Sequence, residues 1–166
     1  MTIKIGDTLP DATLYESTEF GDACPLPPAK VSVAEATKGK KIAIFGIPGA
    51  FTPTCSANHL PGFVKHFDAF KKKGVDEVWC VATNDGFVMA AWGKQAGASG
   101  KIRMLGDGSA EFAKKLGLDI DLAGGGLGTR IKRFSMLVDD GVVKELAVEP
   151  DLGLSVSSAE KLLARL

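Results

Sequence analysis

Lys41-Ile-Ala-Ile-Phe-Gly-Ile47 is a nearly continuous apolar run with the length of a β-strand that is buried on both faces. The loop Pro48-Gly-Ala-Phe-Thr-Pro-Thr54 follows it directly, and a helix is expected over residues 55–73. Pro61 cannot donate to the carbonyl of Ala57, so a kink is expected there. This order of a buried strand, a tight loop and a helix predicts an α/β fold. Apolar residues recur in the helix at spacings of three and four: Leu60, Phe63, Val64, Phe67 and Phe70.

Strand and helix patterns alternate after this unit. Asp139-Asp-Gly141 separates two strand-like runs, which is typical of a β-hairpin. Ser157-Ser-Ala-Glu160 fits a capping box that begins the last helix. The expected strands cover residues 77–82, 102–105, 134–138 and 142–148, and the expected helices cover 85–95, 109–116 and 158–166.

The N-terminal part of the chain predicts a short strand around residues 12–15 and a proline-rich loop over 17–30. Ser32-Val-Ala-Glu35 fits a capping box for a short helix that ends at Gly39. Neither a repeat nor a linker interrupts the pattern, so residues 1–166 are expected to form a single domain. We therefore predict a layered α/β domain with a central mixed β-sheet and helices on both faces.

The composition argues against several classes of function. Of the 166 residues, 45% are hydrophobic and 24% are charged, and 20 Lys and Arg balance 20 Asp and Glu. A net charge of zero argues against general binding to nucleic acid or to an anionic membrane. The N-terminus lacks the pattern of a secretory signal, and no apolar stretch approaches the ~20 residues of a membrane span. With three cysteines and no such signal, free thiols in a reducing compartment, the cytoplasm, are expected.

Cys55 is the candidate reactive residue. It is expected in a first helical turn at the carboxyl end of a buried strand, where functional groups gather in open α/β sheets. Free backbone N–H groups and the positive end of the helix dipole favour the thiolate there, and the thiolate is the reactive form. The hydroxyl of Thr52, three residues earlier, can face the sulfur across the turn. A buried, unreactive packing cysteine is the alternative that the position alone leaves open.

The segment Pro48-Gly-Ala-Phe-Thr-Pro-Thr-Cys55 matches Pro-x-x-x-Thr-x-x-Cys, the signature of the peroxiredoxins. The sequence therefore resembles this family, and the longer string that ends at Ser56 is similar to its peroxiredoxin 5, or type II, branch. The resemblance extends from about Ile5 to the C-terminus. Further blocks that resemble this branch follow in the same order: His59–Phe63, Asn84–Trp92, Gly128–Met136 and Val156–Glu160.

The resemblance implies a thioredoxin-like fold and a thiol-dependent peroxidase that reduces hydrogen peroxide and alkyl hydroperoxides. Cys55 would be the peroxidatic cysteine, Thr52 would hydrogen-bond the thiolate and the peroxide, and Pro48 would shield the intermediate from water. Arg133, rather than Arg130, matches the family's catalytic arginine, because it lies six residues before the acidic end of a strand. Attack of a thiolate on an O–O bond builds negative charge on the leaving oxygen, which a cation and fixed donors stabilise. The product is a cysteine sulfenic acid, and no metal or organic cofactor is required.

The recycling step is expected to depend on an external thiol. Some relatives place a resolving cysteine in a Gly-Leu-x-Cys-Ser context near the C-terminus, where this chain has Val156. Glutathione with glutaredoxin, or thioredoxin, would then reduce an exposed Cys55 sulfur. Cys80 is expected to be a buried strand residue, with a resolving or regulatory role as the alternative, and Cys24 lies in the proline-rich loop. His59, four residues after Cys55, either tunes the thiolate or packs beside it.

Other hypotheses remain open at this point. A thiol–disulfide oxidoreductase would share the fold but needs a Cys-x-x-Cys pair, which Pro53-Thr-Cys-Ser56 lacks. A peroxide sensor, or a redox-regulated binding or holdase protein, is the non-enzyme alternative. The branch usually forms homodimers, for which Phe51 and Trp92 are either contact residues or core residues. Gly124-Gly-Gly-Leu-Gly128 lacks the spacing of a phosphate loop and is interpreted as a flexible turn near the pocket.

Overall fold

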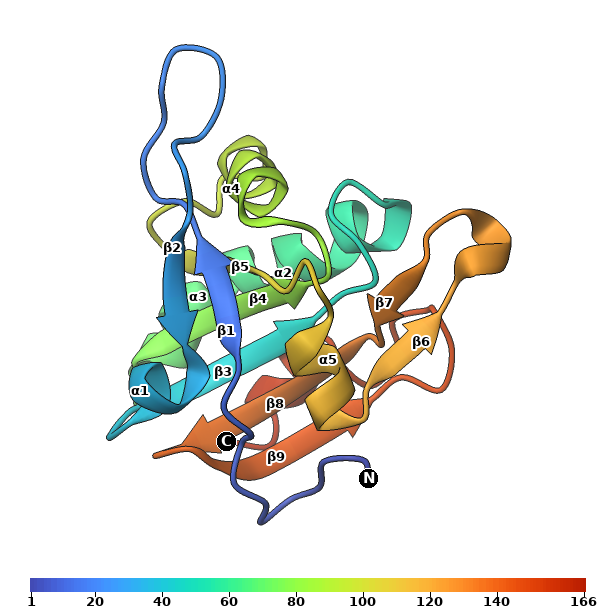
Figure 1. Ribbon diagram of the computed structural model, residues 1–166. Coiled ribbons are helices and arrows are strands. Elements are labelled where there is room, and N and C mark those ends of the chain that lie inside the picture. The colour runs from blue at the N-terminus through green and yellow to red at the C-terminus, as the bar shows by residue number, and fades with distance from the viewer.

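Seven β-strands form one mixed sheet in the computed structural model, which describes residues 1–166 (Figure 1). The protein has nine strands in all: β1 (Thr13–Glu16), β2 (Ala29–Ser32), β3 (Lys41–Gly46), β4 (Glu77–Ala82), β5 (Ile102–Gly106), β6 (Asp119–Asp121), β7 (Thr129–Ile131), β8 (Phe134–Asp139) and β9 (Val142–Val148). The order in the sheet is β2-β1-β5-β4-β3-β8-β9, and β6 pairs with β7 in a separate two-stranded sheet. β3, β4 and β5 are parallel, whereas β8 is antiparallel to β3 and to β9.

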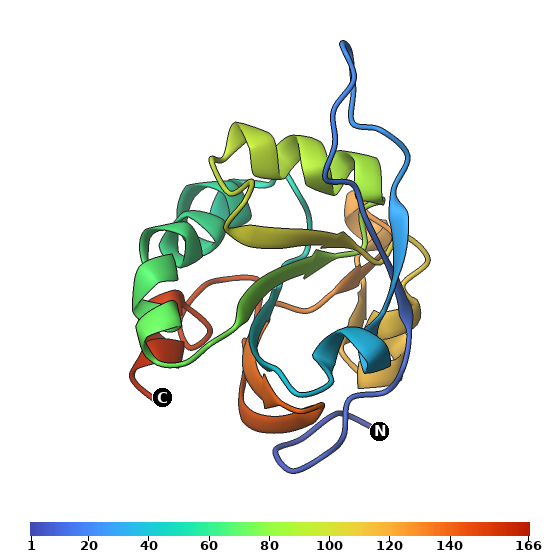
Figure 2. The ribbon, with the colours of Figure 1, turned by 90° about the vertical axis from the view of Figure 1, so that its left-hand side faces the viewer.

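Helices cover both faces of the large sheet (Figure 2). They are α1 (Val33–Thr37), a π-helical turn (Cys55–His59), α2 (Leu60–Lys65), α3 (Phe67–Lys72), α4 (Gly86–Gln95), α5 (Glu111–Leu116), a 3-10 turn (Ala123–Gly125) and α6 (Ala159–Leu163). Ile44 on β3 packs in one apolar core with residues of α1 and α5. Phe45, the next residue, packs in a second core with residues of α2, α3, α4 and α6. The predicted layered α/β architecture, with β3 buried on both faces, is confirmed.

The predicted continuous helix over residues 55–73 is wrong, because the segment is divided into the π-helical turn, α2 and α3. The N–H of Leu60 donates to the carbonyl of Cys55, five residues back. Pro61, which has no N–H to donate, lies in the first turn of α2, so the wide turn replaces the kink that the proline predicts. A second break occurs at His66, where φ is −97° and ψ is 12°. The wide turn sets the spacing at which Cys55 and His59 both become buried.

Two further details differ from the sequence pattern. Residues 117–133 give no strand signal, yet β6 and β7 pair there, with Ile120 opposite Arg130. Strands of three residues are too short to show a period. The predicted turn at Gly124–Gly128 lies in the connection between these two strands. The last helix is capped by Ser158, which accepts from the Lys161 N–H, and not by Ser157. It also ends at Leu163 rather than at residue 166.

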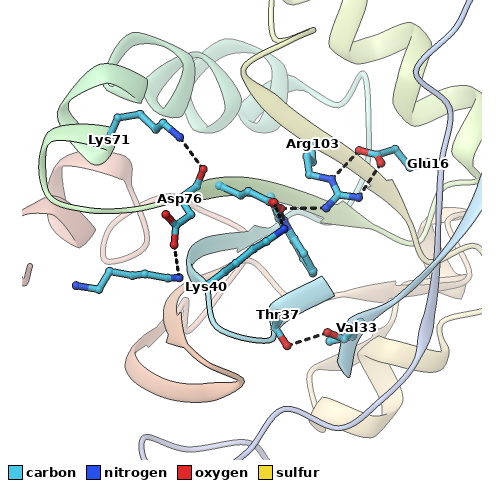
Figure 3. Close-up of polar contacts among 10 residues, drawn as sticks. Glu16, Val33, Thr37, Lys40, Lys71, Asp76 and Arg103 are labelled. Atoms are coloured by element: carbon cyan, nitrogen blue, oxygen red, sulfur yellow. Dashed lines mark hydrogen bonds and ion pairs between the residues drawn. The ribbon is translucent and has the colours of Figure 1, made fainter. Parts of the chain in front are cut away.

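Charged side chains form a network at the amino ends of β3, β4 and β5 (Figure 3). Arg103 pairs with Glu16 at 2.8 Å and with Glu77 at 2.9 Å, and Lys40 pairs with Glu77 at 2.7 Å. Burial raises the pKa of the Glu77 carboxyl, but hydrogen bonds from Lys40, Trp79 and Arg103 outweigh it and lower the pKa to about 2. The two cations and two carboxylates of this network therefore compensate one another.

No helix of the protein combines the length and the apolar character that crossing a bilayer demands.

Candidate active site

Cys55 lies in the first turn of the helical segment that follows β3. The first helical hydrogen bond runs from the Ser56 N–H to the Thr52 carbonyl, at 2.9 Å. The Cys55 side chain is 0% exposed and belongs to the apolar core around Phe45 and Phe63. The expected exposure of the Cys55 sulfur is therefore wrong, because the side chain faces this core rather than solvent.

Arg133 is the cation beside this sulfur. Its Nη2 is 3.2 Å from Cys55 Sγ, although the two residues are 78 positions apart in the chain. Its other donors reach the Leu152 carbonyl at 3.3 Å and the His59 Nδ1 at 3.0 Å. Arg133 is 2% exposed, and its guanidinium has no carboxylate within ion-pair distance. Because all its protein partners other than the sulfur are neutral, its positive charge is directed at Cys55.

His59 accepts one of the Arg133 hydrogen bonds and is itself buried. Its Nε2 is 2.9 Å from the Ser157 carbonyl, which can only accept, so Nε2 carries the proton and Nδ1 accepts from Arg133. Burial, together with the nearby Arg133 charge, lowers the pKa of His59 to about 3. The imidazole is thus neutral at physiological pH and adds no second charge beside the guanidinium.

Thr52 and Pro48 lie in the loop between β3 and the helical segment. The Thr52 hydroxyl donates to the Gly49 carbonyl at 2.7 Å, so its proton is used within the loop while its lone pairs remain available. Pro48 is buried, and its carbonyl accepts from Arg130 Nη1 at 3.1 Å. A Cβ on Gly49 would lie 2.7 Å from Arg130 Nη1, so a larger residue there would displace the end of the Arg130 side chain. Arg130 therefore contacts the loop, whereas Arg133 contacts the sulfur.

The two remaining cysteines lie in different environments. Cys80 on β4 is 0% exposed in the same apolar core as Cys55, and Cys24 is exposed. Burial, and then the neighbouring Cys55, raise the pKa of the Cys80 thiol well above its usual value. Cys80 is thus held as a neutral thiol, which is a poor nucleophile. All three cysteines are free.

Phe51 and Trp92, the two candidate dimer contacts, differ in how far they are exposed to solvent. Trp92 is 2% exposed, and its Nε1 donates to Ser56 Oγ at 3.1 Å, which ties α4 to the turn that carries Cys55. Phe51 is 50% exposed and has a φ of 62°, in the left-handed region that non-glycine residues rarely adopt. Of the pair, Phe51 alone is accessible to a partner.

Sequence reasoning missed the groups that hold Arg133 from the other side. These are the Leu152 carbonyl, which accepts from Arg133 itself, and the Ser157 carbonyl, which accepts from His59; both lie in the loop between β9 and α6. Main-chain carbonyls are present at every position, so no residue pattern could have identified them. No three His, Cys, Asp or Glu side chains come together in a way that could hold a metal ion. The site therefore presents one buried thiol, one uncompensated cation and a set of neutral hydrogen-bonding groups.

Known proteins are similar to this chain in both sequence and fold. The sequence profile of the Redoxin family matches residues 4–163. A chloroplastic peroxiredoxin-2E of Arabidopsis thaliana is 45% identical over 168 residues, which cover 99% of this chain and 70% of the relative. Reduced Prx3 of Vibrio vulnificus in complex with hydrogen peroxide is 45% identical, with a TM-score of 0.90 over 99% of each chain. A Burkholderia cenocepacia structure, provisionally described as a thioredoxin reductase, is 49% identical, with a TM-score of 0.95 over 100% of this chain and 99% of that chain.

The chain belongs to the redoxin family. Within that family it is a peroxiredoxin of the type II, peroxiredoxin 5-like branch, with the thioredoxin-like fold and the thiol-dependent peroxidase activity of that class. The description of the Burkholderia structure names a different enzyme. The present chain has no Cys-x-x-Cys pair for the dithiol chemistry of such a reductase.

Proposed function

We propose that Cys55 is the peroxidatic cysteine and that Arg133 is its catalytic arginine. The observation that carries this assignment is the 3.2 Å approach of Arg133 Nη2 to Cys55 Sγ by a cation that has no carboxylate partner. An uncompensated guanidinium favours the thiolate over the thiol. It also stabilises the negative charge that develops on the peroxide when the O–O bond breaks.

The proposed reaction is a nucleophilic displacement at oxygen. The Cys55 thiolate attacks one oxygen of the hydroperoxide, a new S–O bond forms, and the O–O bond breaks. The sulfur becomes a sulfenic acid, and the released alkoxide or hydroxide takes up a proton to become alcohol or water. Thr52, whose own proton is directed to Gly49, offers a lone pair to the peroxide O–H. Pro48, which is buried within the same loop, limits the entry of water to the sulfenic acid.

The burial of Cys55 has a consequence for recycling. A small peroxide can approach a site that excludes bulk solvent, but an external thiol needs the sulfenic acid to be accessible. We infer that the turn at Cys55–His59, whose hydrogen bonding is already irregular, loosens after oxidation. The donor thiol then attacks the sulfenic acid and releases water, and a second thiol cleaves the mixed disulfide. Glutathione with glutaredoxin, or thioredoxin, supplies these thiols.

We place the proposed homodimer contact beside this site. Large apolar side chains are exposed on the loop before Cys55, on the turn that contacts Arg130 and on the loop that contacts Arg133: Phe51 at 50%, Leu127 at 40% and Leu152 at 48%. Such a patch is typical of a protein interface. Replacing Phe51 by Asp should shift the protein from dimer to monomer in sedimentation velocity. We also propose that residues 1–166 act as a single domain, and that the protein works in the cytoplasm.

The test of the proposed function is mass spectrometry of the reduced protein after one equivalent of hydrogen peroxide, with a sulfenic acid trap present. The trap should attach to Cys55 and to neither Cys24 nor Cys80. A trap on Cys24 or Cys80 with Cys55 unmodified would contradict the assignment. The non-enzyme alternative, a peroxide sensor or redox-regulated holdase, predicts a single oxidation without repeated consumption of peroxide when a thiol donor is added. Sustained turnover with glutathione and glutaredoxin, or with thioredoxin, would exclude it.

A further inference from the structure

The loop between β9 and α6 is folded around one carboxylate, that of Glu149. Glu149 Oε2 accepts from the backbone N–H groups of Ser155, Val156 and Ser157 at 2.9, 2.8 and 2.8 Å and from the Ser157 hydroxyl at 2.7 Å. Glu149 Oε1 accepts from the Ser155 hydroxyl at 2.7 Å. Glu149 is only 5% exposed. One acidic group therefore fixes the path of a segment that has no helix or strand of its own.

The same loop supplies two of the groups that orient the active site. The Leu152 carbonyl accepts from Arg133 Nε, and the Ser157 carbonyl accepts from His59 Nε2, whose Nδ1 in turn accepts from Arg133 Nη1. The backbone N–H of Glu149 also donates to the carbonyl of Arg133 at 2.9 Å. The loop thus holds the guanidinium directly, through the imidazole, and through the main chain.

The charge of Glu149 is not used to neutralise Arg133. Burial raises the pKa of the Glu149 carboxyl, but the hydrogen bonds from Ser155, Ser157 and Val156 outweigh it and lower the pKa to about 2. The carboxylate is ionised at neutral pH and is satisfied by N–H and O–H donors, and it forms no ion pair with Arg133. It can therefore organise the loop without cancelling the charge that faces Cys55.

We propose that Glu149 is a positioning residue for the peroxidase reaction, whose carboxylate fixes the loop that aims Arg133 and His59 at Cys55. The proposal rests on the roles assigned above to Cys55 and Arg133. Without the carboxylate, the Leu152 and Ser157 carbonyls lose their fixed positions, and the guanidinium loses the geometry that it needs when the O–O bond breaks. Misplacement of a catalytic group by about 1 Å can cost about 10²-fold in rate.

The first measurement compares Glu149→Ala, Glu149→Gln and Glu77→Ala in stopped-flow oxidation of the reduced protein by hydrogen peroxide. Glu149→Ala should lower the second-order rate constant by about 10²-fold. Glu149→Gln should recover most of this loss, because its carbonyl can accept the N–H bonds and its amide can donate to Ser155. Glu77→Ala is the matched control, because Glu77 is also a multiply hydrogen-bonded carboxylate with a pKa of about 2 but lies at the other end of the sheet. Glu77→Ala should keep the rate within a few-fold, at the cost of stability.

The second measurement asks whether Glu149 acts through the arginine. If it does, the double variant Glu149→Ala, Arg133→Lys should be no slower than Arg133→Lys alone, because the guanidinium that the Glu149 loop orients is already absent. An effect on the rate that is independent of Arg133 predicts that the two losses multiply, and a role in stability alone predicts an unchanged rate in Glu149→Ala. Multiplied losses, or an unchanged rate in Glu149→Ala, would overturn the proposal. If the wild type itself did not consume peroxide, the proposed function would have failed instead.

Ser157→Ala provides a milder variant if Glu149→Ala does not fold. It removes one hydroxyl donor to Glu149 and leaves the Ser157 carbonyl in the chain. The rate should fall by a smaller factor, and this loss too should vanish when Arg133 is already Lys. A loss that persists in the Arg133→Lys background would contradict the proposed route through the arginine.

Discussion

Arg133 and Arg103 lie at opposite ends of the parallel strands and have opposite surroundings. Arg103 pairs with Glu16 and Glu77, and its guanidinium lies 5.4 Å from the centre of the Trp79 ring. Arg133 contacts one carbonyl, one neutral imidazole and the sulfur of Cys55. A guanidinium shared between two carboxylates is neutralised and serves to hold strands together. A guanidinium held by neutral groups keeps its charge for a thiolate or for a transition state.

The carboxylates at the two ends of the parallel strands also have different hydrogen-bond partners. Glu77 accepts from two cations and from the Trp79 ring N–H, whereas Glu149, the carboxylate behind the active site, accepts only from N–H and O–H groups of its own loop. Both arrangements lower the pKa of the carboxyl to about 2. At the active site, the second arrangement leaves Arg133 without a carboxylate partner.

The largest effect expected is on Cys55 itself. Cys55→Ser should abolish peroxide reduction, because a serine hydroxyl stays protonated and is a poor nucleophile toward an O–O bond. The fold should be unchanged, since the side chains have nearly the same size. Residual turnover above that of buffer, measured by peroxide consumption with a thiol donor, would mean that the chemistry lies elsewhere.

Thr52 tests the neutral donors and acceptors around the charged centre. Thr52→Val should lower the rate constant with peroxide by a factor on the order of 10²–10³, the range for losing one transition-state hydrogen bond. Thr52→Ser, which keeps the hydroxyl, should be milder. Equal losses in the two variants would indicate that the methyl group packs the loop and that the hydroxyl plays no part in the reaction.

Substitution of Glu77 tests whether the charged network at the amino ends of the strands stabilises the fold. Glu77→Ala leaves Arg103 and Lys40 without a shared partner and should lower the free energy of unfolding by about 2 kcal/mol, less than for a fully buried pair. Urea denaturation measures this loss directly. Stability equal to the wild type would show that the network contributes nothing to holding β3, β4 and β5 together.

The stability of the active-site end should depend on pH. His59 has a pKa of about 3 in the folded protein against an ordinary value near 6.5, so between these values the unfolded chain binds a proton that the folded protein does not. Stability is therefore complete above about pH 6.5 and falls as the pH drops toward 3, with a slope of at most about 1.4 kcal/mol per pH unit from this group. His59→Gln should flatten the curve between pH 6.5 and 4.5, where Glu149 does not yet contribute. An unchanged slope there would contradict a buried neutral imidazole.

Cys80 is expected to show the smallest effect. Its thiol is buried and protonated, so it should not form an intramolecular disulfide with Cys55 after oxidation. Cys80→Ser should leave recycling by an external thiol unchanged. A stoichiometric crosslink between Cys55 and Cys80 within single chains, detected by mass spectrometry, would overturn this view.

The sequence predicts those features whose cause is local. β3 and β4 are recognised from apolar runs, and Ser32 caps α1 as its capping box predicts, by accepting from the Glu35 N–H. The division of the helix after Cys55 has no signal in the sequence, because the apolar residues from Leu60 to Phe70 keep spacings of three and four across the break at His66. The burial of Cys55 depends on how β8 brings Arg133 against it, which is a long-range contact.

The sequence predicts those residues of the site that belong to a recognisable motif. Cys55, Thr52 and Pro48 follow from one contiguous stretch, and Arg133 from a resemblance, since no spacing rule links residues that lie 78 positions apart. Glu149 and the carbonyls of Leu152 and Ser157 had no signal at all. Their importance comes from the way in which a loop folds around a carboxylate, and only the structure shows that.

The central claim is that an uncompensated arginine drives the reaction of Cys55 with peroxide, and Arg133→Lys compared with Arg103→Lys tests it most directly. Both changes keep the positive charge and remove the planar fork of donors. Arg133→Lys should lower the second-order rate constant with hydrogen peroxide by about 10²-fold, whereas Arg103→Lys should lower stability and keep the rate within a few-fold. Equal rates for the two variants, or a greater loss in Arg103→Lys, would contradict the account.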